Sequence, residues 1–373
     1  MTNDTINFEM GPSQTWPTLD AHVATALMKK LQSMSHRGYK PGRFPYDIYE
    51  PTIKNIKKFV GLPQNENWEL YYGPDATTFM RSSVNLFTTY DRVVIISNGA
   101  FGERWHKELV IQGRINNLTF FKPEILGDAV NLYSLKENKL VKMVCVTLNE
   151  TSFGIQYSKD EIASLRTTYP NAIICVDGVS GFPGVEIPYD CADYILCSGH
   201  KLFGIMPGVG FCLMNKRAID RAKSVFDATG TSYGVSLVDL HKSYQKFETP
   251  CTPNTLGIFS HGMVAGDMYD FGLNKLQERM YMRSRWLYDF FDKKESCARV
   301  ANETHASVTS IVIDTSHVTN DSSNLIHEFS ESGIIIAGGY GNYASKHIRI
   351  ANYFAIDDNS FGHFQDVASS IFK

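Results

Sequence analysis

An aspartate and a lysine that follow two successive apolar runs are the residues of this chain best suited to chemistry. The run 172–176 ends in Asp177, and the run 194–197 is followed shortly by Lys201. Short apolar runs bounded by Gly, Pro and Asp predict buried strands of an α/β sheet. Open α/β sheets bind ligands beyond the carboxyl ends of their strands, so we expect both side chains to face one crevice.

A carboxylate and an amine placed in this way are the two groups that pyridoxal phosphate (PLP) requires. The amine of Lys201 would form a Schiff base with the cofactor's aldehyde, and Asp177 would keep the pyridine nitrogen protonated so that the ring accepts electrons. Either residue alone is more often a solvated loop lysine or a helix N-cap. The pair is more specific, because the sequence SGHK is followed closely by three glycines.

The stretch Cys175–Gly210 resembles the fold-type I PLP enzymes of the class V aminotransferase group, and other segments resemble phosphoserine aminotransferases. The resemblance implies an α/β fold with two domains. The large domain would contain a mostly parallel sheet of the seven-stranded type, and a small C-terminal α+β domain would follow it. The alternation of predicted strands and helices also favours a parallel sheet. We expect an irregular arm at 1–15, the PLP-binding domain at 16–265, and a linking helix with the small domain at 266–373. One long helical stretch, at about 255–293, would link the domains.

The resemblance assigns several residues to the cofactor. The segment 73–78, GPDATT, opens a helix after a predicted strand, and free backbone N–H groups there form an anion site. Ala76 and Thr77 are assigned to the cofactor phosphate, and Phe101 to stacking on the pyridine ring, where phosphoserine aminotransferases usually carry Trp. Thr151, in an Asn-Glu-Thr signature, would donate a hydrogen bond to the cofactor.

Two further cofactor contacts follow from the same resemblance. His200 precedes the reactive lysine, at a position where bacterial phosphoserine aminotransferases commonly have Gln. Thr252 would reach the PLP phosphate of the partner subunit, although Cys251 replaces the Asn that is usual before it. Residues lent across an interface imply a homodimer with shared active sites.

The substrate-binding residues are likewise implied by the resemblance. His36 and Arg37 match a Ser-His-Arg motif that is lent across the dimer to the far anionic group of the substrate, and Arg349 would bind the α-carboxylate. Without the resemblance, these residues would be assigned to a surface loop and to the polar face of a strand. Many members carry a His-Arg pair before the carboxylate arginine, and here Asn342 and Tyr343 stand in its place. A side chain with one negative charge, such as that of glutamate, therefore fits better than a phosphate.

The implied reaction transfers an amino group between an amino acid and a 2-oxo acid. The amino acid would be phosphoserine or a related anionic or small amino acid, with glutamate and 2-oxoglutarate as the partner pair; with phosphoserine, the enzyme would serve serine biosynthesis. Lys201 would act as general base and acid. The alternatives are a class V aminotransferase of the serine or alanine–glyoxylate type, and a cysteine desulfurase or lyase that uses Cys251 or Cys297. A non-catalytic protein of this fold is disfavoured by the presence of both Asp177 and Lys201.

Composition restricts the partners and the compartment. The 373 residues are 43% hydrophobic and 20% charged, with a net charge of −3, so no nucleic-acid partner is expected. No run of 18 apolar residues and no leader pattern occur, so we expect a cytoplasmic protein without a membrane association. Seven cysteines without CxxC pairs indicate reduced thiols and no metal site.

Overall fold

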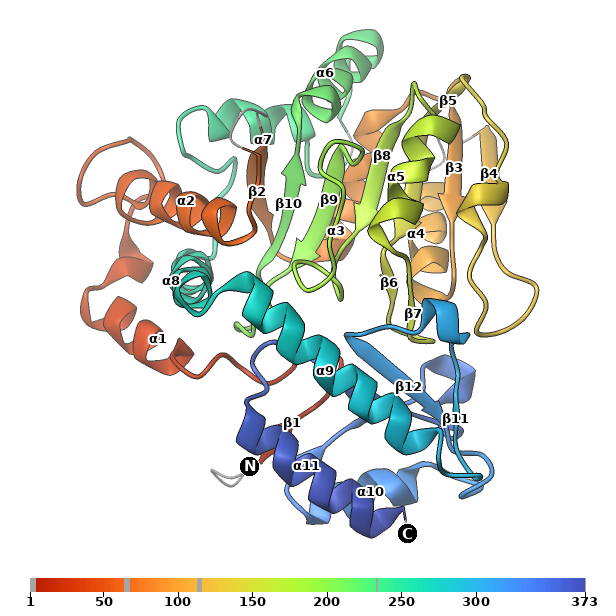
Figure 1. The fold of residues 1–373 in the computed structure, drawn as a ribbon. Helices are drawn as coiled ribbons and strands as arrows, with labels where there is room; N and C mark the ends of the chain where they lie inside the picture. The colour runs from red at the N-terminus through yellow and green to blue at the C-terminus, as the bar shows by residue number, and fades with distance from the viewer. Residues whose placement is uncertain (1–4, 64–67, 113–115, 233, 373) are drawn as a thin grey trace.

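A seven-stranded sheet forms the centre of the computed structural model, which describes residues 5–63, 68–112, 116–232 and 234–372 (Figure 1). The strand order is β2-β10-β9-β8-β5-β3-β4. Strand β10 runs antiparallel to both of its neighbours, and the other adjacent pairs are parallel, which confirms the predicted mostly parallel sheet. The strands are β2 (Glu69–Gly73), β3 (Arg92–Ile96), β4 (Asn117–Phe121), β5 (Val141–Thr147), β8 (Ile173–Asp177), β9 (Tyr194–Ser198) and β10 (Gly210–Met214).

Helices cover both faces of this sheet, because its strands are apolar on both sides. In β3, Val94 and Ile96 join the core on one face while Val93 and Ile95 join the core on the other, as the two-residue period of a strand requires. The first face is covered by α2 (Glu50–Phe59), α5 (Lys159–Thr168) and α8 (Thr255–Phe271). The second is covered by α3 (Ala76–Ser82), α4 (Ala100–Ile111), α6 (Lys216–Thr229) and α7 (Leu237–Tyr244).

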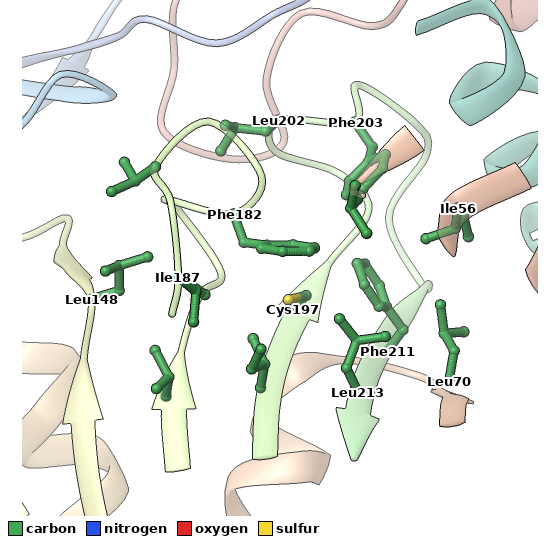
Figure 2. Close-up of a cluster of buried hydrophobic side chains, with 14 of the residues drawn as sticks. Ile56, Leu70, Leu148, Phe182, Ile187, Cys197, Leu202, Phe203, Phe211 and Leu213 are labelled. Carbon is green, nitrogen blue, oxygen red and sulfur yellow. The ribbon is translucent and has the colours of Figure 1, made fainter. Parts of the chain in front are cut away.

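Figure 2 shows part of the first core, with the strands seen lengthwise. Leu70, Cys197 and Leu213 lie on their strands, Phe182 and Phe203 lie on the loops beyond the strands, and Phe182 stands next to Cys197. All five side chains are buried. The turn that carries Lys201 is therefore fixed by packing from the loop side as well as by the sheet.

The small C-terminal domain is an antiparallel sheet backed by helices, as predicted. Its strand order is β11-β12-β15-β14. The strands are β11 (Ala298–Arg299), β12 (Ser310–Asp314), β14 (Ala337–Gly338) and β15 (His347–Ala351), and its helices are α10 (Ser323–Glu331) and α11 (Asp358–Ile371). Ile311, Ile348 and Phe364 lie in its core.

The expectation of one long helical stretch between the domains is wrong at one residue. Gly272 has a φ of +100°, which glycine tolerates, and it separates α8 from α9 (Leu273–Phe291). Helix α9 begins against the large-domain core with Leu276 and ends in the small-domain core with Phe291. This helix therefore links the two domains (Figure 1).

The N-terminal arm contains a strand, so the expectation of a wholly irregular arm at 1–15 is wrong; residues 1–4 lie outside the described chain. Strand β1 (Ile6–Asn7) pairs in parallel with β13 (Ile334–Ile335) of the small domain. The arm forms a strand here because the backbone N–H and C=O groups of β13 can pair with those of the arm. Helix α1 (Leu19–Met28) follows the arm. Of the helices in the described residues, none is long and apolar enough to cross a membrane.

Candidate active site

Asp177 and Lys201 lie beyond the ends of two neighbouring strands. Strands β8 and β9 are parallel, with Asp177 paired to Leu196. Both charged side chains are buried, at 3% and 6% exposure. The Asp177 carboxylate accepts a hydrogen bond from the backbone N–H of Val179 at 3.0 Å. The two residues therefore lie at the same edge of the sheet, as the sequence predicts.

Burial shifts the ionisation of both groups toward neutrality. Burial raises the pKa of Asp177 to about 7, although the hydrogen bond from Val179 acts to lower it. Burial also lowers the pKa of Lys201 to about 8, although the negative charge of Asp177 acts to raise it. In the described chain no ion pair joins the two, so each is a buried ionisable group that lacks an ionic partner. A ligand that brings a protonated ring nitrogen to Asp177 and a carbonyl carbon to Lys201 would satisfy both, and PLP has these two groups.

An aromatic ring lies beside the lysine. Phe101 stands in the first turn of α4, and the Lys201 amine is 5.5 Å from the centre of its ring. The Tyr340 ring, from the small domain, lies 5.4 Å from the Phe101 ring, centre to centre. The structure thus brings Phe101 beside Lys201, and its stacking on a cofactor ring stays a prediction.

Glu150 holds the helix that carries Phe101, a role that the sequence analysis missed. It ends the strand β6 (Asn149–Glu150), which pairs with β7 (Ile155–Gln156), and it is fully buried. Its carboxylate accepts the backbone N–H groups of Phe101 at 3.1 Å and Gly102 at 3.2 Å, and the Ser152 hydroxyl at 2.6 Å. Burial raises the pKa of Glu150. The sequence signal was present, because this acid is the central residue of the Asn-Glu-Thr signature.

Thr151 belongs to a buried hydroxyl network. Its Oγ1 is 2.6 Å from the Ser180 hydroxyl, which donates to the carbonyl oxygen of Asn149 at 2.9 Å. The hydroxyl of Thr309, from the small domain, donates to the Ser180 carbonyl at 2.6 Å. The network fixes Thr151 next to the domain boundary, and its contact with a cofactor stays a prediction.

The N-terminal arm lies against the turn of Lys201. A Cβ on Gly11 would come within 3.2 Å of both His200 Cδ2 and Lys201 Cε. The backbone N–H of Ser13 donates to the His200 carbonyl at 3.3 Å. His200 Nδ1 lies 2.7 Å from the Ser198 hydroxyl, and burial lowers the pKa of this imidazole to about 4. His200 is therefore neutral at pH 7.

The loop predicted to hold the phosphate opens α3. Asp75 is the N-cap, and its carboxylate accepts the N–H and the hydroxyl of Thr78 at 2.7 and 3.0 Å. Ala76 and Thr77 are the first two helical residues, whose N–H groups have no carbonyl partner within a helix. Thr252, from a distant part of the sequence, lines a cavity of about 360 Å³ together with Gly73, the first residue of the predicted phosphate loop. Its contact with a partner subunit's cofactor stays a prediction.

Arg349 faces the same site from the small domain. Its Nε donates to the carbonyl oxygen of Gly338 at 2.7 Å, and its guanidinium lies 5.5 Å from the centre of the Tyr340 ring. Burial lowers the pKa of Arg349, and its charge is among those that lower the pKa of Lys201. The structure thus groups Arg349 with Lys201, and the binding of a substrate carboxylate by Arg349 stays a prediction.

Arg37, the other arginine predicted to bind substrate, does not lie beside Lys201 and Arg349 of the same chain. Arg37 forms an ion pair with Glu248 at 3.0 Å and donates to the Pro250 carbonyl at 2.8 Å. Its side chain is 49% exposed, and His36 beside it is half-buried. The roles of His36 and Arg37 in a shared site therefore stay predictions.

A second arginine of the site was missed. Arg104 donates from Nη2 to the hydroxyl of Tyr340 at 2.9 Å, and its guanidinium lies 5.1 Å from the centre of the Phe101 ring. It follows Phe101 by three residues on α4, so both lie on one helix face. This spacing is the signal that could have identified it.

Known proteins resemble this chain in sequence and in structure. Residues 129–350 match the family model described as aminotransferase class-V. The 42 kDa subunit of the soluble hydrogenase of Anabaena cylindrica is 28% identical over 222 residues, which cover 58% of this chain and 56% of that protein. A 2-aminoethylphosphonate–pyruvate transaminase of Salmonella paratyphi C is 28% identical over 167 residues, or 42% of each chain. The chain therefore spans about half the length of the curated relatives it matches.

The structural likeness extends over the whole chain. A phosphoserine aminotransferase from Cytophaga hutchinsonii has a TM-score of 0.90 at 25% identity, and the match covers 99% of both chains. The family model covers more than half of the residues, including Asp177, Lys201 and Arg349. The protein described above therefore belongs to the class V aminotransferase family, and it has the fold-type I architecture of PLP-dependent transferases.

Proposed function

We propose that this aminotransferase acts on anionic amino acids, with glutamate and 2-oxoglutarate as one pair and phosphoserine or a related anionic or small amino acid as the other substrate. The observation that carries the proposal is the grouping of the buried Lys201 amine with the buried Asp177 carboxylate and the Arg349 guanidinium, whose charges both act on the pKa of Lys201. An amine for proton transfer and a guanidinium for a carboxylate are what transamination of an amino acid requires.

The residues of this chain divide the work between them. PLP, when bound, supplies an aldehyde that condenses with amines and a protonated ring that accepts an electron pair. Because the pKa of Lys201 is lowered to about 8, a useful fraction of its amine is unprotonated near neutral pH and takes the proton from the substrate Cα. Asp177 would hold the protonated ring nitrogen of the cofactor, Arg349 would orient the substrate's α-carboxylate, and Phe101 would shield one side of the site from water.

The anionic substrate is supported by two of the relatives. One is a phosphoserine aminotransferase, and another is a transaminase for a phosphonate. Within this chain, Asn342 is exposed, and Tyr343 stacks on His347 at 4.9 Å between ring centres, so this segment offers no guanidinium. A carboxylate side chain such as that of glutamate is therefore favoured over phosphate.

The decisive experiment adds amino acids one at a time to the PLP-loaded protein and follows its absorbance band at about 410–430 nm. Loss of the band with glutamate or phosphoserine, and its return with 2-oxoglutarate, supports the proposal. A response to alanine or serine alone, with glyoxylate as acceptor, would assign the protein to the other aminotransferase type. Release of sulfide from cysteine would instead identify a desulfurase.

The proposal includes a homodimer in the cytoplasm that shares its active sites through His36, Arg37 and Thr252. Arg37 and Thr252 stand at positions that suit this sharing, since Arg37 is exposed and Thr252 lines a surface cavity. Lys201→Ala and Arg37→Ala proteins, each inactive alone, should recover activity when their subunits are exchanged, because one site of the mixed dimer is then intact. Failure to recover activity, in a dimer shown by light scattering, would contradict a shared site.

A further inference from the structure

Arg104 is a guanidinium in the active site to which neither the reaction nor the fold gives a role. It is half-buried on α4. Its guanidinium lies 5.1 Å from the centre of the Phe101 ring, and the Lys201 amine lies 5.5 Å from the same centre. After burial and the charge of Arg349, the charge of Arg104 also lowers the pKa of Lys201. Arg104 therefore lies one aromatic ring away from the reacting amine.

No carboxylate forms an ion pair with Arg104 in the part of the chain that the structure describes, although its charge lowers the pKa of Glu108 and acts against the raised pKa of Asp177. Glu108, four residues later on α4, would be the usual helical partner. It is instead held by Arg81 through two hydrogen bonds, at 2.7 and 3.0 Å. Glu150 is occupied by backbone N–H groups and the Ser152 hydroxyl. The charge of Arg104 is therefore available to a ligand.

Arg349, the other arginine of the site, likewise has no carboxylate as an ion-pair partner among the described residues. Arg349 has a carbonyl oxygen, that of Gly338, as its hydrogen-bond acceptor. Tyr340 lies between the two arginines: it accepts a hydrogen bond from Arg104 at 2.9 Å, and its ring centre is 5.5 Å from the Arg349 guanidinium. Two guanidinium groups that contact one tyrosine match a ligand with two anionic groups, because each planar fork binds one carboxylate or phosphate.

We propose that Arg104 binds the distal anionic group of the amino acid while Arg349 binds its α-carboxylate, so that Arg104 selects dicarboxylic or phosphorylated amino acids over neutral ones. This inference rests on the proposed function and gives it a residue within the same chain. It also supplies the cation that Asn342 and Tyr343 do not provide. Tyr340 is the positioning residue, since its hydroxyl fixes the direction of the Arg104 side chain.

The test compares Arg104→Gln, Arg104→Lys and Tyr340→Phe with Lys107→Gln, which removes an exposed positive charge from the same helix. Half-reactions of the PLP-loaded proteins are followed with glutamate, phosphoserine, alanine and serine. Binding of glutarate and of butyrate to the cofactor-free proteins is measured by calorimetry. The ratio of the half-reaction rates with glutamate and with phosphoserine shows whether a carboxylate or a phosphate is the preferred distal group.

For Arg104→Gln we expect the KM for glutamate to rise by about 10- to 100-fold, because a hydrogen-bonded charge pair is lost, while the values for alanine stay within about threefold. Arg104→Lys should recover part of the loss, and Tyr340→Phe should show a rise of about 2- to 10-fold. The wild type and Lys107→Gln should prefer glutarate to butyrate, and Arg104→Gln should lose that preference.

Three results would overturn this inference. One is an equal loss for alanine and glutamate in Arg104→Gln, which indicates a structural role; a lowered melting temperature would accompany it. Another is a wild type that reacts with alanine but with neither anionic amino acid. The third is an unchanged glutarate preference in Arg104→Gln. A wild type that reacts with no amino acid would contradict the proposed function instead, and the glutarate comparison would still decide the role of Arg104.

Discussion

The Glu150 carboxylate accepts the backbone N–H of Phe101 at 3.1 Å, so a buried acid caps the helix that carries the aromatic wall of the active site. A negative charge at the N-terminus of α4 is favoured by the free N–H groups and the helix dipole. The same carboxylate accepts the Ser152 hydroxyl, which joins α4 to the β6–β7 hairpin. Phe101 is thus placed by electrostatics as well as by packing.

Replacing Glu150 by Gln should therefore destabilise the protein and weaken cofactor binding. The amide keeps the size of the side chain but has one acceptor oxygen fewer, which leaves a buried donor unpaired at a cost of about 1–3 kcal/mol. Urea denaturation measures the loss in the free energy of unfolding. Glu186→Gln is the control, because Glu186 is 64% exposed and should change stability by less than about 0.5 kcal/mol. Equal effects of the two substitutions would contradict the capping role.

The stability of the cofactor-free protein should depend on pH through the two central residues. The pKa of Asp177 rises from 3.8 unfolded to about 7 folded, so the folded state binds the proton more tightly and stability falls as pH rises from about 4 to 7. The pKa of Lys201 falls from 10.5 to about 8, so the unfolded state holds the proton longer and stability rises from about pH 8 to 10.5. Each slope is at most about 1.4 kcal/mol per pH unit.

Thermal unfolding over this pH range measures both slopes. Asp177→Asn should remove much of the decline below pH 7, leaving the share that comes from the raised pKa of Glu150. Asp190→Asn, at an exposed position, is the matched control and should retain the full decline. The lowered pKa values of His200 and His261 make stability rise with pH over the same range, so the comparison between the two variants decides the outcome. Profiles of Asp177→Asn and Asp190→Asn that coincide from pH 4 to 7 would show that Asp177 titrates normally.

Lys201→Ala should abolish transamination. The substitution removes both the amine that bonds the cofactor and the group that moves the substrate proton, and loss of a general base alone costs about 10²–10⁴-fold. The variant should also lack the absorbance band after PLP is added. Lys216→Ala serves as the control, because that side chain is 70% exposed on α6. Full activity in Lys201→Ala would refute the assignment of the catalytic lysine.

Gly11→Ala should slow the reaction by displacing the arm from Lys201. The φ of Gly11 is +145°, and the added Cβ would come within 3.2 Å of Lys201 Cε and His200 Cδ2. Gly42→Ala separates the two causes, because Gly42 also has a positive φ but its Cβ would meet no atom within 4 Å. We expect both variants to lose stability and Gly11→Ala alone to lose kcat. The hypothesis fails if the two variants have the same rate.

The sequence by itself determined the strands, the alternation with helices and the two central residues. The runs before Asp177 and Lys201 are apolar on both faces, a pattern that belongs to buried parallel strands, and the carboxyl ends of neighbouring parallel strands meet at one edge. Local patterns of this kind carry their own physical cause, so they can be recognised without a structure. The prediction of a single linking helix failed because one glycine, Gly272, turns the chain.

Only the tertiary structure decided which charges act on the site. The Asn-Glu-Thr signature and the spacing from Phe101 mark Glu150 and Arg104 as candidates, but these local patterns do not show which groups the two charges meet in the folded chain. Glu108 and Arg81, by contrast, pair with each other outside the site. Folding buries Glu150 under the N-terminus of α4 and brings Arg104 to Tyr340, which lies 236 residues later in the chain. The effect of a charge depends on its burial and on its neighbours in space, and the packing of the two domains sets both.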